Sequence, residues 1–241
     1  MEGRTLTFHL AGINNQNFLM RDEETGSYWQ QINGLAVSGP LTGKQLQLVD
    51  SDELTFALWK TEQPGGFVLK AVTQFAKDYD EKHWDVKMAK ARTVIDFPGS
   101  GLKARELVLG IHAFGASRAF PIDLVKAEKL VEDRVGTEPV VLLLGPDGES
   151  IRAFQARTQE GTAAPDFYRT GAEPQTKMDA AAIASVALGP VMMDSAGNAW
   201  NFQGCAVSGP LTGTCLKPVY LIKDYWFDWR NYNRRTTVYK H

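Results

Sequence analysis

Short runs in which polar and apolar positions alternate predict that the chain is mainly β. Residues 45–49 (QLQLV) alternate with the period of two that a half-buried strand requires. Residues 28–32 (YWQQI) and 35–38 (LAVS) contain aromatic and β-branched side chains, which strands favour. Gly39 and Pro40 then interrupt the pattern, because proline has no N–H to donate to a sheet ladder. We therefore expect short strands joined by tight turns.

The middle of the chain has strands and helices of its own. Residues 105–112 and 115–121 predict a pair of strands. The turn sequence Gly-Pro-Asp-Gly at 145–148 predicts a hairpin between strands over 139–144 and 149–155. Short helices are expected in three places, listed here in chain order: 67–91 as a helix plus a loop, 122–131, and the alanine-rich run 179–188.

One string of eight residues, AVSGPLTG, occurs twice, at 36–43 and at 206–213. The match extends in both directions, because Asp22 and Trp29 precede the first string as Asp194 and Trp200 precede the second. Downstream of the strings, Trp59 and Trp229 also align. A unit of about forty residues therefore recurs, and such self-similarity indicates duplication of a structural unit. The two units span approximately 19–59 and 191–229.

These patterns together predict a mainly β chain, a β-rich α+β fold, built from two pseudo-equivalent β halves related by an internal duplication. Two or three short helices accompany the strands. Two copies are too few for a solenoid, so we expect the halves to belong to a single β-rich domain spanning residues 1–241.

Composition and charge narrow the class of protein. The chain is 44% hydrophobic and 22% charged, which is typical of a soluble globular protein. The formal net charge of −2 argues against a nucleic-acid partner, which would favour a strongly basic face. The longest apolar run, PVVLLL, is too short for a transmembrane segment. The chain opens MEGRTLTFHLAG, without a basic segment followed by an apolar run, so we expect no signal peptide.

Short stretches distributed along nearly the whole chain resemble a known family. The matching stretches are, in order, LTF at 6–8, NFLMRD at 17–22, TGSYW at 25–29, GPLTG at 39–43, RELVLG at 105–110, AFP at 119–121, YWFDW at 225–229 and TVY at 237–239. They are similar to the bacterial and archaeal family called domain of unknown function thirty-one seventy-nine. The resemblance implies an exported or envelope-associated protein and no agreed biochemical role. The family's Cys-Pro-x-Cys segment is absent here, and the comparable place has Gly-Pro-Asp-Gly at 145–148.

Two cysteines, Cys205 and Cys215, flank the second string. The first copy has Leu35 and Gln45 there, so the fold does not require cysteine. Three interpretations stay open: a cross-strand disulfide, a soft-metal pair, or two unpaired thiols. Zinc would require about four ligands, and the histidines do not supply them, because no metal-type spacing links any two of the following: His9, His83, His112 and His241. We therefore expect no metal site.

No catalytic constellation emerges from the remaining residues. The stretch Gly99-Ser-Gly101-Leu-Lys-Ala104 matches a dinucleotide fingerprint in spacing, but a strand is expected after it rather than before it. The repeated serines, Ser38 and Ser208, have no activating base nearby in the sequence. We therefore expect no cofactor, and whether the protein is an enzyme is left open, with the balance against it.

The repeated aromatic residues are the richest chemical resource of the chain. They could line a groove for a ligand or form the core of each half, as aromatic side chains commonly do. The predicted binding residues are Tyr28, Trp29, Ser38, Thr42, Trp200, Ser208 and Thr212. We expect a non-catalytic binding or assembly module, a subunit that docks on a larger partner, with either a protein or a small ligand as its partner. The alternative is a redox- or metal-linked protein or enzyme whose site lies between the halves.

Overall fold

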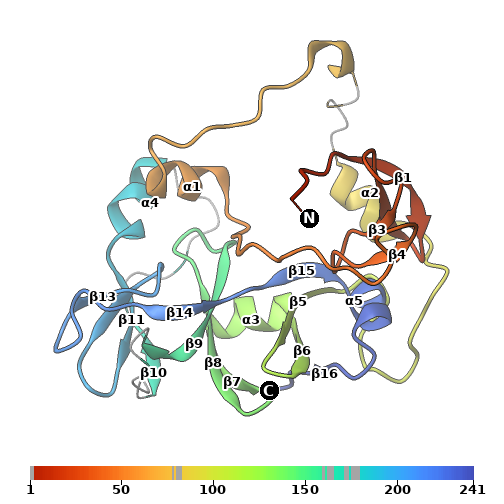
Figure 1. Ribbon diagram of the computed structural model, residues 1–241. Helices are drawn as coiled ribbons and strands as arrows, with labels where there is room; N and C mark the ends of the chain where they lie inside the picture. The colour runs from red at the N-terminus through yellow and green to blue at the C-terminus, as the bar shows by residue number, and fades with distance from the viewer. Residues whose placement is uncertain are drawn as a thin grey trace.

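The computed structural model describes residues 3–77, 79, 83–158, 161, 166–170, 174 and 180–241. Its described strands form four sheets of four strands each, so the chain is mainly β, as predicted (Figure 1). The first copy of the repeat forms one sheet, in the order β1 (Phe8–Asn14), β2 (Asn17–Asp22), β3 (Tyr28–Gln30), β4 (Ala36–Ser38). The second copy forms another, in the order β10 (Phe167–Arg169), β11 (Pro190–Asp194), β12 (Ala199–Asn201), β13 (Ala206–Ser208). Each is a meander of antiparallel neighbours.

The repeated string has the same backbone conformation in both copies. Gly39 has φ 95° and Gly209 has φ 97°, in the left-handed region that favours glycine. A Cβ atom on either residue would lie 2.7 Å from the backbone Cα of Ser27 or Asn198. In both turns the glycine lies directly against the preceding hairpin, where a residue with a Cβ atom would clash. This shared requirement explains why the string recurs.

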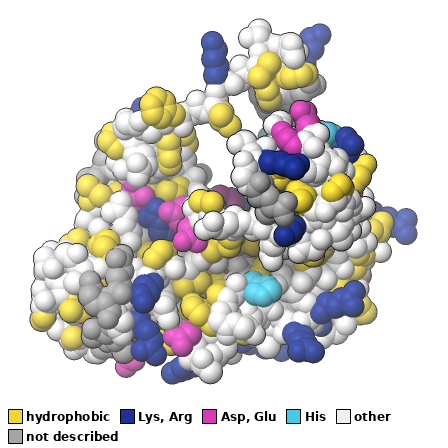
Figure 2. All heavy atoms as spheres, in the orientation of Figure 1, with side chains coloured by type: hydrophobic (Ala, Val, Ile, Leu, Met, Phe, Trp, Pro, Cys, Tyr) yellow, Lys and Arg dark blue, Asp and Glu magenta, His cyan; other side chains and the backbone are white. Residues whose placement is uncertain are grey.

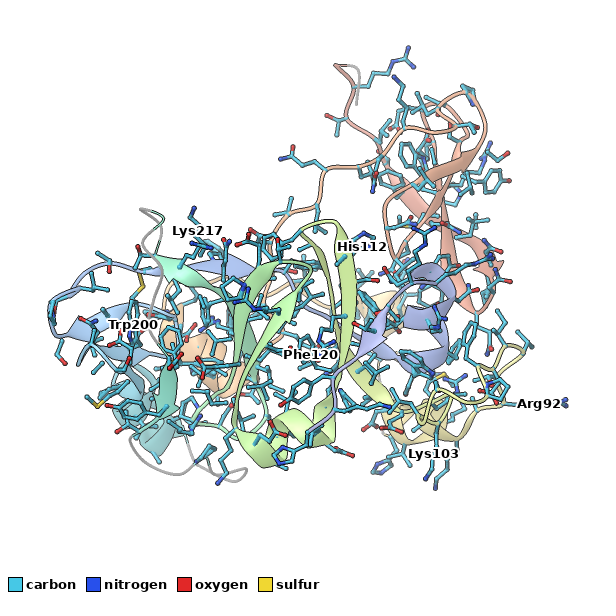
Figure 3. The ribbon with its side chains drawn as sticks, turned by 90° about the horizontal axis from the view of Figure 1, so that it is seen from below. Arg92, Lys103, His112, Phe120, Trp200 and Lys217 are labelled. Atoms are coloured by element: carbon cyan, nitrogen blue, oxygen red, sulfur yellow. A yellow bond between two sulfur atoms is a disulfide. The ribbon has the colours of Figure 1, made fainter. Side chains whose placement is uncertain are left out.

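Two further sheets form the centre of the molecule. One has the order β14 (Leu216–Val219), β9 (Ile151–Thr158), β8 (Glu138–Leu144), β7 (Leu130–Val135). The other has the order β15 (Ile222–Tyr225), β5 (Leu107–Ala113), β6 (Ala116–Pro121), β16 (Thr237–Val238). Helix α3 (Ile122–Glu128) packs against both, and Phe120, near the middle of Figure 3, is fully buried in the cluster that they share. The predicted hairpins at 105–121 and 139–155 are confirmed.

The chain leaves each copy of the repeat along an arm that crosses the centre of the molecule. Residues 44–55 run from the first copy towards the second, and β14 with β15 run back in the opposite direction (Figure 1). Each arm ends in a helix, α1 (Phe56–Glu62) or α5 (Trp226–Tyr232). The two C-caps match as well, because Gln63 donates its backbone N–H to the carbonyl of Trp59 as Asn233 does to that of Trp229.

Because the arms cross, each helix contacts the copy to which it does not belong, although α5 buries Trp226 and Trp229 against the central strands β5 and β6. Helix α1 follows the first copy, but Leu58 is fully buried among residues of the second copy, including Trp200 and Phe202. Helix α5 follows the second copy, but Asp228 accepts a hydrogen bond from Asn17 of β2 in the first. The two halves are therefore exchanged at their ends.

Three expectations about secondary structure need correction. Residues 45–49 do not form a strand: only Gln45 makes an isolated bridge, whereas the equivalent residues of the second copy form β14 on the edge of β9. Alternation alone could not show that only one arm finds an open sheet edge. The second correction concerns the aromatic runs ending at Trp59 and Trp229, which are helices rather than parts of the β unit.

The third correction is that the described residues contain more than two or three short helices. Beyond α1, α3 and α5 there are α2 (Trp84–Lys90), α4 (Ala180–Ala187) and a 3-10 turn, η1 (Thr73–Phe75). All three fall where helices were expected, η1 and α2 within 67–91 and α4 within 179–188. Asp179, and residues 78 and 80–82 of the earlier stretch, lie outside the described residues.

Candidate functional site

Among the predicted binding residues, the repeated tryptophans Trp29 and Trp200 lie in the interior, each with 0% of its surface exposed. The indole Nε1 of Trp29 donates to Asp22 Oδ2 at 2.7 Å, and that of Trp200 donates to Asp194 Oδ2 at 3.0 Å. Trp200 is seen within the second copy in Figure 3. These rings hold the turn carboxylates in place and are out of reach of a ligand in solution.

The two carboxylates also cap their own turns. Asp22 Oδ1 accepts from the backbone N–H of Thr25 at 2.5 Å, and Asp194 Oδ1 accepts from that of Asn198 at 2.9 Å. Burial raises the pKa of Asp22, but hydrogen bonds from Trp29 and Thr25 outweigh it and hold that pKa below its ordinary value. Both aspartate side chains are therefore structural, with their hydrogen bonds satisfied within their own copy.

The other predicted binding residues lie towards the surface. Ser38, Thr42, Ser208 and Thr212 are exposed, and Tyr28 is half-buried. The hydroxyls of Thr42 and Thr212 each donate to a glycine carbonyl of their own turn at 2.6 Å. A binding role for these surface residues stays a prediction.

The structure joins Cys205 and Cys215 by a disulfide, with an S–S distance of 1.98 Å. The equivalent residues of the first copy, Leu35 and Gln45, form the same type of isolated antiparallel bridge without a covalent link. Both sulfur atoms are consumed by the bond, so in this state they are not available to ligate a metal ion.

A cleft of about 340 Å³ lies where the two arms cross. Its apolar lining comes from both arms and from the central sheets: Leu54, Leu107, Leu109, Ile122, Ile151, Ala153, Val219 and Leu221. Residues 51–55 of the first arm pass along one side of it. The volume falls at the lower end of the range of about 300–1,000 Å³ that is usual for small-molecule sites. The geometry suits a compact ligand with an apolar body.

Charged side chains that form ion pairs surround this apolar lining. Lys126 pairs with Glu149 at 2.6 Å, and Lys223 pairs with Glu53. Both glutamate side chains are strongly exposed, so water competes for them, whereas burial lowers the pKa of Lys223. Acidic, basic and hydrophobic side chains gather near the middle of the face shown in Figure 2.

Arg152 lies deeper in the cleft wall and is fully engaged. Its guanidinium donates to Asp52 Oδ2 at 2.7 Å and to Glu62 Oε2 at 2.8 Å. It also lies 4.7 Å from the ring centroid of Phe202. Arg152 therefore fastens the first arm and α1 to β9, and its charge is already balanced.

A second set of hydrogen bonds fastens the first arm to the Gly-Pro-Asp-Gly turn. Thr55 donates from its hydroxyl to Asp147 Oδ2 at 2.7 Å and from its backbone N–H to Ser150 Oγ at 3.0 Å. The Ser150 hydroxyl donates to the same Asp147 oxygen at 2.6 Å. No histidine is among the described residues that line the cleft, so these hydroxyls have no activating base there.

A wider and more open hollow of about 770 Å³ lies beside the C-terminal segment. Its basic lining residues are His112, Arg118, Arg134, Arg234 and Arg235. Three of these groups already have partners. Arg118 pairs with Asp133, His112 Nδ1 is 2.8 Å from Asn233 Oδ1, and Arg134 donates to the carbonyl of Thr137 at 2.8 Å. The hollow has less apolar enclosure than the cleft between the arms, which we take as the candidate site.

Comparison with known proteins places this mainly β chain in a family whose function is not known. The chain belongs to the family described as "Protein of unknown function (DUF3179)", whose model matches residues 1–236. No curated protein and no solved structure matches the chain significantly. Within the part that the structure describes, no helix has the length and apolar character needed to cross a membrane.

No motif along the chain singles out the residues that line the cleft. Glu53 and Lys223 are 170 residues apart, which is also the spacing of the repeated strings, so they occupy equivalent positions. That equivalence was available from the alignment of Trp59 with Trp229. What the sequence lacked was the crossing of the arms, which brings the two equivalent positions together.

Proposed function

We propose that this protein is a non-catalytic binding module, and that its ligand is a small molecule with an apolar body and an anionic end. The observation that carries the proposal is the cleft between the arms, with its apolar lining and two lysines at its edge. Among the described residues, each lysine pairs with an exposed glutamate, Glu149 for Lys126 and Glu53 for Lys223, which an anionic ligand would displace at little cost. Lys223 is the lysine whose pKa is lowered by desolvation, so its charge gains from such a ligand.

Calorimetry with octanoate, an apolar chain that ends in a carboxylate, tests this proposal. We expect saturable binding, weakened about tenfold or more in Lys223→Met, because a charge-assisted hydrogen bond of about 1.5–3 kcal/mol is lost. Lys217→Met is the matched control, since Lys217 lies on β14 outside the cleft lining and should leave the affinity unchanged. Leu221→Trp, which fills the cleft from the second arm, should abolish binding. No saturable binding, or binding unaffected by Leu221→Trp, would refute the proposal.

A second candidate function, docking on a larger protein, rests on a different observation. An extended segment after α1 projects from the body of the molecule, at the top of Figures 1 and 2. On it, Phe67 is 98% exposed and Leu69 is 99% exposed, with Val68 between them also exposed. Adjacent apolar side chains so fully in water are typical of a surface that meets a partner. The partner would offer an apolar groove to this segment.

The docking candidate is tested by affinity purification from the protein's own cells. Phe67→Ser combined with Leu69→Ser should release a protein that the wild-type chain retains in stoichiometric amount. Lys70→Ser, in the same segment, is the control and should retain it. A wild-type chain that purifies as a lone monomer, or a retained protein that the double substitution does not release, would exclude docking through this segment.

A further inference from the structure

Two acidic residues of the second arm stand where the first arm has leucines. With the 170-residue spacing that aligns Trp59 and Trp229, Asp224 corresponds to Leu54 and Asp228 to Leu58. Leu58 is fully buried in the core and Leu54 packs against the same cluster. The duplicated framework therefore accommodates apolar side chains at both positions. Carboxylates there are an added feature of the second arm.

One of the two aspartates, Asp228, meets an amide from the first copy, and Asp224 neighbours Asp228. Asn17, on β2, donates from Nδ2 to Asp228 Oδ2 at 3.0 Å, and the two side chains are buried, with Asn17 8% and Asp228 6% exposed. Three oxygen atoms of this group, Asn17 Oδ1, Asp224 Oδ2 and Asp228 Oδ1, accept no hydrogen bond from any described residue. A buried acceptor left unpaired costs about 1–3 kcal/mol.

The group is also short of positive charge. Burial, and then the neighbouring Asp228, raise the pKa of Asp224 to about 8, and burial likewise raises the pKa of Asp228. Arg105 opposes the shift of Asp228, but its guanidinium lies over the rings of Tyr225 and Phe227, 5.0 Å from each centroid, and donates from Nε to a backbone carbonyl. The buried carboxyl of Asp228 and the half-buried carboxyl of Asp224 thus lie close enough to interact, and Arg105 offsets this only at Asp228.

We propose that Asp224, Asp228 and Asn17 form a binding site for a hard divalent cation, Ca²⁺ or Mg²⁺. Carboxylate and amide oxygens are the ligands that these ions prefer, and water completes their coordination. The described residues contain no group of three His, Cys, Asp or Glu side chains placed to hold a metal. The site would therefore be a mixed one, in which the amide of Asn17 supplies the third protein ligand. A bound ion would join α5 to the first copy and stabilise the exchange of the two halves.

Terbium(III), which resembles Ca²⁺ in size and preference for oxygen, is a direct probe because nearby aromatic rings sensitise its emission. Titration of the metal-free wild-type chain should give saturable emission for a single ion, and excess Ca²⁺ or Mg²⁺ should displace it. Thermal unfolding should occur at a higher temperature with that divalent cation than with a chelator. Absence of saturable emission in the wild-type chain would overturn the proposal without any variant.

Variants then locate the ion. Restoring the residues of the first copy, Asp224→Leu with Asp228→Leu, should remove saturable emission while the fold persists, because that copy shows leucine to be compatible there. Asp224→Asn alone, a smaller change, should weaken the affinity for terbium about tenfold or more. Asp123→Asn removes an exposed carboxylate on α3 and should have no effect. Wild-type affinity in Asp224→Asn would overturn the proposal.

Discussion

Glu53 and Lys223 occupy the same position in the two copies of the repeat and form an ion pair with each other at the centre of the molecule. Equivalent residues can touch only close to the axis that relates the copies, as at a two-fold interface. Two glutamates or two lysines would repel each other there. The second copy has therefore diverged from the first at a position where the duplication itself creates the contact.

This relationship explains why the ends of the halves are exchanged. The arms pass each other at the pair, so α1 continues to the second copy and α5 to the first (Figure 1). Helix α1 completes the core of the second copy, and α5 is tied to the first copy by hydrogen bonds to Asn17 and Asn14. The cleft beside the pair is lined by residues of both arms, which links the candidate site to the duplication.

The repeated turn gives a first prediction about stability. Gly39→Ala should lower the free energy of unfolding by about 3 kcal/mol, because it adds a clash with Ser27 to a left-handed φ. Gly43→Ala is the matched control: its φ is 83°, but a Cβ would meet nothing within 4 Å, so the loss should be about 1 kcal/mol. Urea unfolding measures both. Equal losses would contradict the role assigned to close packing at Gly39.

The exchanged helix gives a second prediction. Leu58→Ala should cost about 3 kcal/mol, since the side chain is fully buried in the core of the second copy. Phe56→Ala, on the exposed side of α1, should cost less than about 1 kcal/mol. Hydrogen exchange would show the effect of Leu58→Ala around β11 and β12 rather than in the sheet of the first copy. Faster exchange confined to β1–β4 would contradict the crossing of the arms.

The disulfide gives a third prediction. Cys205 and Cys215 are ten residues apart, and closing such a loop stabilises by about 2–3 kcal/mol in the chain-entropy model. Dithiothreitol should therefore lower the melting temperature of the wild-type chain, by the amount that corresponds to this loss of free energy of unfolding. The variant Cys205→Leu with Cys215→Gln, which has the residues of the first copy, should fold and ignore the reductant. A wild-type melting temperature that dithiothreitol leaves unchanged would show that the bond contributes nothing.

A fourth prediction concerns pH. The pKa of Asp224 is about 8 in the folded protein and 3.8 without the fold. The folded state favours the protonated carboxyl of Asp224. Its contribution to the free energy of unfolding is fully present below the unfolded pKa of 3.8 and is lost as the pH rises towards 8. In a chelator, the free energy of unfolding should therefore fall between pH 5 and pH 8, on the order of a few kcal/mol. The fall should be smaller in Asp224→Leu. Parallel pH profiles would show that Asp224 does not titrate in this way.

Local sequence patterns predicted those elements whose neighbours are close in the chain. The hairpins around residues 114 and 145–148 depend on turn residues and on alternation within a few positions, so they were accessible to sequence reasoning. The duplication was accessible for a similar reason, since Gly39 and Gly209 record the same local backbone requirement. Residues 45–49 were misjudged because a strand also needs an edge to pair with, and the first arm finds none among the described strands.

The sequence by itself determined that the chain is mainly β, that a unit occurs twice, and that each unit ends its string at a glycine turn. These features are local, because backbone conformation and short-range pairing are set by adjacent residues. Only the tertiary structure decided that the arms cross, that Glu53 meets Lys223, and that Asn17 meets Asp228. Those contacts join residues about two hundred positions apart, and burial of apolar surface between whole elements selects them rather than any pattern along the chain.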